Sequence, residues 1–134
     1  MRVVIDTNVW ISRLLLVDSV AARAVDKALE EFEVVVSEAS VDELARVLSR
    51  EKFGRYVSVR DREEFIGRLL KVTTMVAVLS DISDCRDPKD NRFLALALDS
   101  ESNFIISGDA DLLTLNPWRR IEIVSPGAFL ADRA

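Results

Sequence analysis

Carboxylates stand beside several apolar segments of this chain, and their positions suit metal-dependent chemistry. Six of them draw attention: Asp6, Glu43, Asp87, Asp90, Asp109 and Asp111. Carboxylates that share a cleft cannot all stay ionised without a counter-charge. A hard divalent cation with oxygen ligands, Mg²⁺ or Mn²⁺, is the natural neutraliser. Such ions suit phosphoryl chemistry because they activate water and stabilise the entering and leaving oxygens.

The rest of the composition leaves few other chemistries. The 134 residues contain no histidine, which excludes a Ser-His-Asp triad, an imidazole base and any histidine-containing metal site. Cys85 is the single cysteine, which excludes an intrachain disulfide and a cysteine-cluster zinc site. A hydrophobic fraction of 49% argues against disorder. Any catalysis must therefore rest mainly on carboxylates.

Short apolar segments alternate with helical patterns along the chain, which has the length of a single domain, residues 1–134. We predict strands at 2–6, 33–37, 74–79, 103–107 and 121–124. Helices are predicted at 8–17, 20–32, 41–48, 61–71, 91–100 and 127–132. This alternation predicts an α/β fold with a doubly wound parallel sheet. Ligands in such folds bind beyond the carboxyl ends of the strands, where the strand order reverses.

The first two carboxylates also have structural explanations. Asp6 could cap the helix that follows it, although a charge at the end of a buried strand is otherwise costly. Glu43 stands three residues after Ser40, as in a capping box, which alone would account for a glutamate there. For Glu43 the structural and the functional explanations have about equal weight.

The later carboxylates can be explained in the same way. Asp87 before Pro88 is typical of a helix start and looks structural, whereas Asp90, one turn further, looks functional. Asp109 could cap a short helix at 110–115. Because so many structural coincidences at one edge of a sheet are less probable than one site, we expect these acids to act together.

Four segments carry a family resemblance, in order and in matching context. VIDTN, SVDEL, DPKDNRFLALA and SGDADLL resemble the PIN domain family of ribonucleases, with the best agreement to the bacterial and archaeal branch of VapC-type toxins from toxin–antitoxin pairs. The resemblance extends from about Val3 to Leu130. It implies a five-stranded parallel sheet of order 3-2-1-4-5, flanked by helices, and Mg²⁺- or Mn²⁺-dependent hydrolysis of RNA phosphodiesters.

The resemblance also assigns roles to individual residues. The family's four catalytic acids correspond to Asp6, Glu43, Asp90 and Asp109. Of these, Asp6, Asp90 and Asp109 would hold the metal, with Asp111 as an accompanying acid, while Glu43 would position a second ion or orient the attacking water. Asn8 and Ser107 match polar residues beside the metal. Asp87 is a spare carboxylate near Asp90, so the ligand could be either of the two.

The net charge of −5 argues against a protein that binds duplex nucleic acid through a strongly basic surface. The cationic residues are nevertheless unevenly distributed along the chain. One cluster lies near Phe53 and Tyr56 and contains Arg46, Arg50, Lys52, Arg55, Arg60 and Arg62; Lys89 and Arg92 bracket Asp90. Arginines beside exposed aromatic rings suit contact with single-stranded RNA. The equally weighted alternative is a solvated helix end whose cations pair with neighbouring carboxylates.

Partners and location are expectations of the same kind. The segment Val9–Val17 is apolar nearly all round, which favours burial in the core over contact with another chain. The resemblance implies a homodimer and an antitoxin partner. Asp6 interrupts any signal-peptide core, and the longest apolar run, Phe93–Leu98, is too short for a membrane span. We therefore expect a cytoplasmic protein without membrane contact.

Two other functions are compatible with the same fold and composition. A receiver-type signalling domain would need a phosphate-accepting aspartate at the end of the third strand and a lysine after the fifth; Asp81 is a poor acceptor, and the segment Ser125–Gly127 lacks the lysine. A non-catalytic RNA-binding module would retain the fold without turnover. Intact catalytic acids argue against this second rival.

Overall fold

The computed structural model describes residues 1–132 and contains one sheet of five parallel strands. The strands lie in the order β3-β2-β1-β4-β5, as expected, with β1 at Arg2–Ile5, β2 at Glu33–Val36, β3 at Thr74–Met75, β4 at Phe104–Ile106 and β5 at Glu122–Val124. Val4 of the central strand lies opposite Val35 on one side and Ile105 on the other. The expected domain runs to residue 134, and residues 133–134 lie outside the described part.

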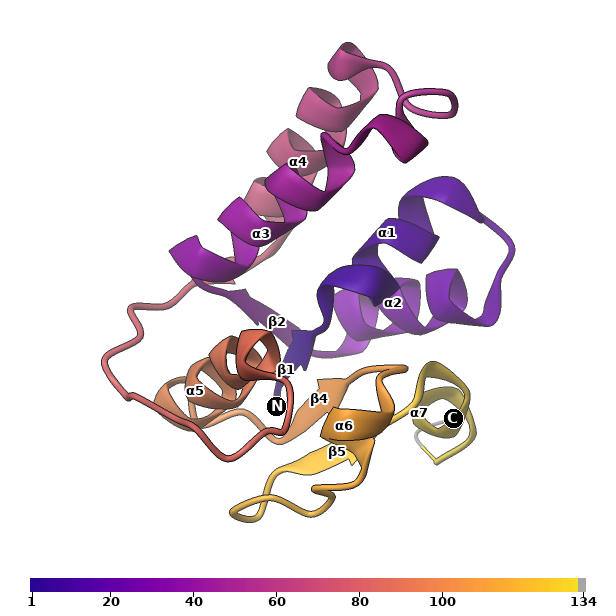
Figure 1. Ribbon diagram of the computed structural model, residues 1–134. Coiled ribbons are helices and arrows are strands. Elements are labelled where there is room, and N and C mark those ends of the chain that lie inside the picture. Colours follow the sequence, from indigo (N-terminus) through magenta and orange to yellow (C-terminus); the bar gives the residue numbers. More distant parts are fainter. Residues whose placement is uncertain (133–134) are drawn as a thin grey trace.

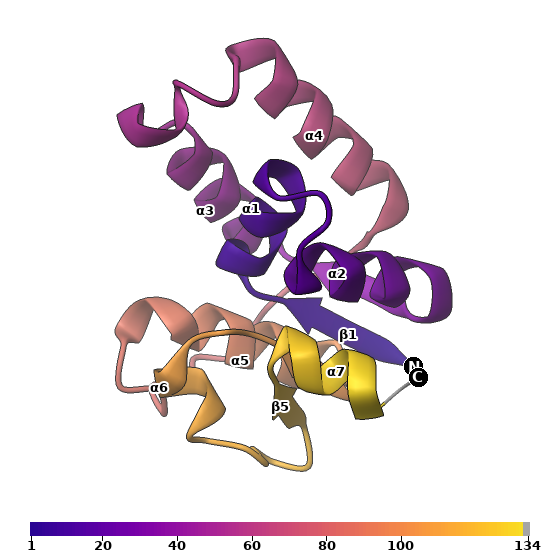
Figure 2. The same ribbon diagram turned by 90° about the vertical axis from the view of Figure 1, so that its right-hand side faces the viewer.

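The larger helical layer covers one face of the sheet (Figures 1 and 2). It consists of α1 at Thr7–Leu15, α2 at Val20–Glu31, α3 at Glu38–Leu48, α4 at Val59–Val72 and α7 at Pro126–Asp132. Val3 and Ile5 belong to this core, in which Phe129 of α7 packs against Phe32 and Phe104 with ring centroids 5.4 and 6.2 Å away. Helices α3 and α4 run side by side and project beyond the sheet, joined by a turn that contains the short 3-10 helix η1, Glu51–Phe53 (Figure 1).

The opposite face carries a smaller layer. It consists of α5 at Asn91–Asp99 and α6 at Ala110–Leu113, with the 3-10 helix η2 at Pro88–Asp90 directly before α5. Val4, Ile105 and Ile123 point into this second core, where they meet the fully buried Phe93 and Leu112. Successive residues of β1 thus enter opposite cores, which explains why the strand is apolar without alternation.

Helix α3 begins three residues earlier than predicted. Ser37 is its N-cap and accepts a hydrogen bond from the backbone N–H of Ser40, 3.1 Å away, while the Ser40 hydroxyl lies 3.0 Å from the backbone N of Ser37 and accepts in return. The capping box therefore joins Ser37 to Ser40, and the predicted box from Ser40 to Glu43 is wrong. Because Glu43 lies in the middle of the helix, capping cannot explain it.

The third strand is shorter than predicted. Only Thr74 and Met75 pair with β2, whose last residue is Val36, and residues 76–80 continue without strand structure. β3 is the edge strand, so beyond the end of β2 it has no neighbour to pair with. Leu79, which the apolar pattern placed in the sheet, is 92% exposed.

The strand order places the switch point between β1 and β4. A receiver-type sheet of the order 2-1-3-4-5 differs from this one, so that rival is excluded on topology. Within residues 1–132, every helix is too short or too polar to serve as a membrane span.

Candidate metal centre

Asp6 and Ser107 meet at the switch point. Each follows the last residue of its strand, β1 or β4, and the Ser107 hydroxyl donates a hydrogen bond of 2.6 Å to Oδ2 of Asp6. Asp6 also caps α1, since Oδ1 accepts from the backbone N of Asn8 at 3.4 Å. Both the structural and the functional explanations of Asp6 therefore apply. Burial raises the pKa of Asp6, and the nearby carboxylates of Asp109 and Glu43 add to this, while the bond from Ser107 lowers it.

Three further carboxylates converge on the same edge. One oxygen from each of Asp87, Asp90 and Asp109 lies within 4.8 Å of the others. Asp87 caps η2 through a 3.1 Å bond from the backbone N of Lys89, and Asp109 caps α6 through a 2.8 Å bond from the backbone N of Asp111. Each cap uses one carboxylate oxygen and leaves the other available. The structure thus brings Asp87 and Asp90 to the cluster together.

Asp90 is the carboxylate that most needs a counter-charge. Its side chain is 8% exposed, and Oδ2 is buried without a hydrogen-bond donor among the described residues. Burial raises the pKa of Asp90 to about 7, with further contributions from the proximity of Asp109, Asp6 and Asp87. An ionised group of this kind is costly unless it is paired. An orphaned oxygen beside two other carboxylates has the donor chemistry of a Mg²⁺ or Mn²⁺ site, so the residues present fit such an ion.

Glu43 faces the same cleft but is already compensated. Its Oε2 accepts a 2.8 Å hydrogen bond from the Thr7 hydroxyl. Its Oε1 lies 3.7 Å from Nη1 of Arg92 and 3.8 Å from Nη2 of Arg46, which come from α5 and α3. Glu43 is therefore held on both sides by side chains of this protein, unlike Asp90.

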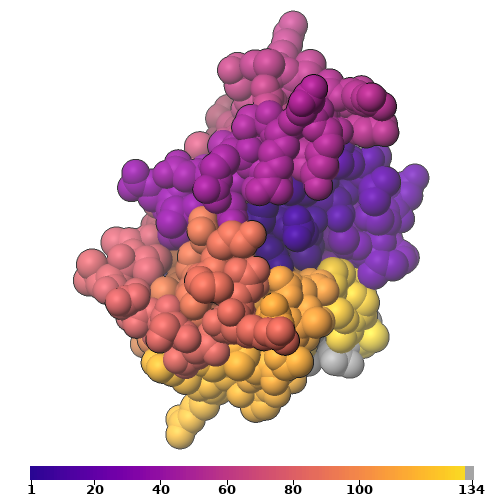
Figure 3. Space-filling model, in the orientation of Figure 1, coloured from indigo at the N-terminus to yellow at the C-terminus, as the bar shows by residue number. Residues whose placement is uncertain are grey.

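These groups line one polar cleft of about 120 Å³. Its lining contains the carboxylates of Asp6, Glu43, Asp87, Asp90 and Asp109, two cationic side chains, and the residues Thr7, Asn8 and Val47. The cations are Arg50 and Lys89. Figure 3 shows the indigo start of the chain between the magenta atoms of α3 and the orange atoms of α5 and α6.

Some of the predicted site residues lie elsewhere. Asp111 is absent from the lining and from the group of three carboxylates, so its role as an accompanying acid stays a prediction. Lys52 and Arg55 belong to the turn between α3 and α4; both are exposed and lie outside the lining. Thr7 is the residue that the sequence argument missed. Its signal was its position between Asp6 and Asn8, where α1 begins.

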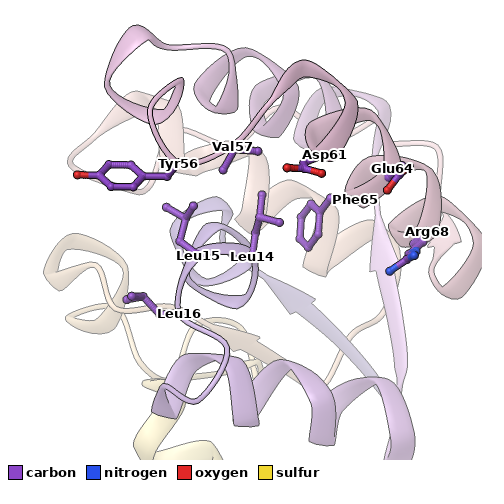
Figure 4. Close-up of a pocket in the computed structure, with 9 residues that line it drawn as sticks. All are labelled: Leu14, Leu15, Leu16, Tyr56, Val57, Asp61, Glu64, Phe65 and Arg68. Atoms are coloured by element: carbon purple, nitrogen blue, oxygen red, sulfur yellow. The ribbon is translucent and has the colours of Figure 1, made fainter.

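A separate apolar groove of about 600 Å³ lies between α1 and α4 (Figure 4). Leu14, Leu15 and Leu16 form one side of it, facing Val57 and Phe65, and Tyr56 extends along its edge. The segment Val9–Val17 is therefore divided. Its first half is buried in the core, as expected, whereas Leu16 and Val17 are 60% and 63% exposed.

Comparison with known proteins shows which family this chain belongs to. A sequence model of the PIN domain matches residues 2–111. The chain belongs to the PIN domain family. This PIN domain is 32% identical over 119 residues to the uncharacterized protein MJ1680 of Methanocaldococcus jannaschii, a match that covers 85% of this chain and 74% of that protein.

A solved structure shares the fold of this PIN domain. It is described as the crystal structure of VapBC2 from Rickettsia felis bound to a DNA fragment from their promoter. The TM-score is 0.64, the identity is 8%, and the match covers 93% of this chain and 98% of that one. The match shows that the two chains share a fold over 93% of this one.

Proposed function

We propose that this PIN domain is a metal-dependent endoribonuclease that hydrolyses phosphodiester bonds of single-stranded or loop RNA. The observation that carries the proposal is the buried Oδ2 of Asp90, which has no described donor and lies among the carboxylates of Asp87 and Asp109. PIN domains are generally nucleases, and a set of clustered carboxylates is the donor set that phosphoryl-transfer metals use.

The residues that would hold Mg²⁺ or Mn²⁺ are Asp90 and Asp109, with Asp6 and Asp87 beside them. A bound divalent cation supplies charge stabilisation for the phosphate and a lowered pKa for water. Ser107 orients Asp6 through the bond to Oδ2, and the cap bonds of Asp87 and Asp109 fix the free oxygens of those carboxylates. These contacts keep the ligand set in place before the ion arrives.

Glu43 has a different part in this proposal. Because Thr7, Arg46 and Arg92 already satisfy its charge, Glu43 does not need the cation for neutralisation. Its position on the lining suits a group that orients the attacking water or accepts its proton. We therefore assign Glu43 to the water and the aspartates to the metal.

The cations on and around the cleft give a polyanion a place to bind. Arg50 and Lys89 line the cleft, and Arg46 and Arg92 stand beside Glu43, from which they could also reach a phosphate. Lys52 and Arg55 extend this cationic surface along the α3–α4 turn, where the Lys52 ammonium lies 5.0 Å from the Phe53 ring centroid. Together they form the proposed RNA-contacting surface.

Cleavage of labelled single-stranded RNA with Mn²⁺ or Mg²⁺ tests the nuclease. The critical variant is Asp90→Asn, and Asp42→Asn is the matched control, since Asp42 is an exposed residue of α3 outside the cleft. We expect the wild type and Asp42→Asn to cleave, and Asp90→Asn to lose at least 100-fold (on the order of 10²) of the rate, as for loss of a key electrostatic group. A single-stranded DNA arm reports substrate preference. Equal cleavage by Asp90→Asn and Asp42→Asn would refute the proposal. Binding of RNA by the wild type without any cleavage would also refute it and would favour a binding module.

We also propose that this protein is the toxin of a toxin–antitoxin pair and forms a homodimer. The fold shared with a chain of VapBC2 supports an antitoxin partner. The groove beside α1 supports a binding place for it, because Leu14, Leu15 and Phe65 offer an apolar floor that suits an apolar segment. Co-purification with the product of the adjacent gene, and its loss in Leu15→Glu, test the pairing; light scattering tests the dimer.

A further inference from the structure

Three arginines where α3 connects to α4 have no ion-pair partner among the described residues: Arg50 and Arg55 lie in the turn, and Arg62 lies in the first turn of α4. Arg2, Arg13, Arg46, Arg60, Arg92 and Arg119 all pair with carboxylates. Arg50, Arg55 and Arg62 have no carboxylate within 4.0 Å among the described side chains, as is also true of Arg23, Arg68, Arg86 and Arg120, but these three line a cleft together. Unpaired arginines held close together repel one another, so an acidic protein gains nothing from this arrangement unless an anion joins it.

The three arginines line one cleft of about 430 Å³ between the end of α3 and the start of α4. Arg62 is half-buried, and its Nη1 donates a 3.2 Å hydrogen bond to the carbonyl oxygen of Leu48. That bond fixes the guanidinium, which has five N–H donors and so retains others for a ligand. The lining also contains one carboxylate, that of Glu51, which leaves the cationic side chains in excess.

Arg50 connects this arginine cleft with the metal centre. It lines both clefts from a position just beyond α3, where its backbone is extended, and in the catalytic cleft it joins Glu43 and Val47 of that helix. Because Arg50 lines both clefts, a strand whose scissile phosphate lies among the aspartates can continue past the end of α3 into the arginine cleft.

We propose that the cleft of Arg50, Arg55 and Arg62 is a phosphate subsite, which binds a backbone phosphate of single-stranded RNA away from the scissile bond. The proposal rests on the nuclease function and adds to it a second point of attachment for the substrate. Guanidinium groups suit phosphate because they donate two parallel hydrogen bonds. RNA is favoured over an acidic peptide because Arg50 makes the cleft continuous with the carboxylates of the metal centre.

Binding of oligouridylate, followed by fluorescence anisotropy over a range of salt concentrations, tests the subsite. All proteins carry Asp109→Asn, so that no substrate is consumed. The test variant adds Arg55→Gln, because Arg55 is exposed and lines the arginine cleft but not the metal centre. The control variant adds Arg23→Gln, which replaces an exposed arginine of α2. One phosphate contact to a single strand contributes about 0.7 to the slope of log K against log salt, equivalent to about fivefold in Kd at about 0.1 M salt.

We expect Arg55→Gln to lose this slope and this affinity, and Arg23→Gln to retain both. Equal slopes and Kd values in the two variants overturn the subsite, as does weakened binding of polyglutamate with unchanged binding of RNA. Because the assay needs no turnover, its result is independent of the cleavage experiment. Loss of cleavage with an intact Arg55 effect would refute the nuclease and leave an RNA-binding cleft.

Substrate length provides a second measurement in the active enzyme. A dinucleotide has a single phosphodiester, so with that group at the metal centre it has no second phosphate for the arginine cleft, whereas a longer oligouridylate has phosphates for both. We expect Arg55→Gln to lower kcat/KM about fivefold for the long substrate at about 0.1 M salt, mainly through KM, and to leave the dinucleotide rate unchanged. An equal loss on both substrates would show that Arg55 acts on the fold or the metal centre instead.

Discussion

Replacing Asp90 with asparagine is expected to stabilise the metal-free protein at pH 8. Burial raises the pKa of Asp90 from 3.8 to about 7 in the folded state, so the folded protein holds this proton more tightly than the unfolded chain. The contribution of Asp90 to stability is greatest below pH 4 and is lost as the pH rises towards 7. Above that window the folded protein carries a carboxylate that its surroundings disfavour. Asparagine removes this penalty, and it breaks no cap because the Asp90 side chain caps nothing.

The size of the effect follows from the shift. About three pKa units at about 1.4 kcal/mol each give an upper bound of about 4 kcal/mol, and solvent screening in the open cleft reduces this to about 1–3 kcal/mol. Urea unfolding at pH 8 in EDTA measures the difference, with Asp42→Asn as the control. At pH 4 we expect the difference between Asp90→Asn and wild type nearly to vanish.

Metal is expected to offset this difference in stability. Mn²⁺ at about 100 times its Kd stabilises the wild type by about 2.7 kcal/mol, because the ion binds only the folded state, and Asp90→Asn is expected to lose most of this gain. A variant that is less stable than wild type in EDTA at pH 8 would refute the reasoning that the Asp90 charge is uncompensated. An Mn²⁺ response that survives the substitution would refute its assignment as a ligand.

Three other substitutions test particular contacts. Thr7→Val keeps the side-chain shape but removes the hydrogen bond to Glu43, so we expect RNA cleavage to slow about tenfold, with kcat affected more than KM. Ser37→Ala removes the N-cap of α3 and is expected to cost about 1 kcal/mol in urea unfolding. Phe129→Ala opens a fully buried position between Phe32 and Phe104 and is expected to cost about 3–5 kcal/mol by the same measurement; a loss below about 1 kcal/mol would contradict the described packing of α7.

The fold could be predicted because its central strands are buried on both faces. The β1 segment Val3–Ile5 is apolar at every position, as a parallel strand between two helical layers requires. The edge of the sheet could not be predicted in the same way. Residues 76–80 carry the apolar pattern of a strand, yet no neighbouring strand reaches them, and pairing depends on partners that a local pattern does not contain.

The sequence was enough to predict which acids meet at the site, but not which side chains contact them. Asp6 and Asp109 each follow a predicted strand, and the rule for carboxyl ends of strands is enough to bring them together. The sequence did not decide between Asp87 and Asp90 because both stand near the start of one helix; their burial separates them, and Asp90 is the deeper of the two. The bond from Thr7 to Glu43 joins residues 36 positions apart, and spacing along the chain says nothing about such a pair.

The ion pair between Glu43 and Arg92 has a mechanical consequence. Glu43 belongs to α3 in the larger layer and Arg92 to α5 in the smaller one, so the pair adds a charged link where these two helices meet beyond the edge of the sheet. At the cleft the two layers are therefore joined by charge as well as by packing. Such links respond to ionic strength and to anions that compete for the arginine. A phosphate that enters the site and draws Arg92 away from Glu43 would weaken the link between α3 and α5. Access to the cleft would then depend on the substrate itself.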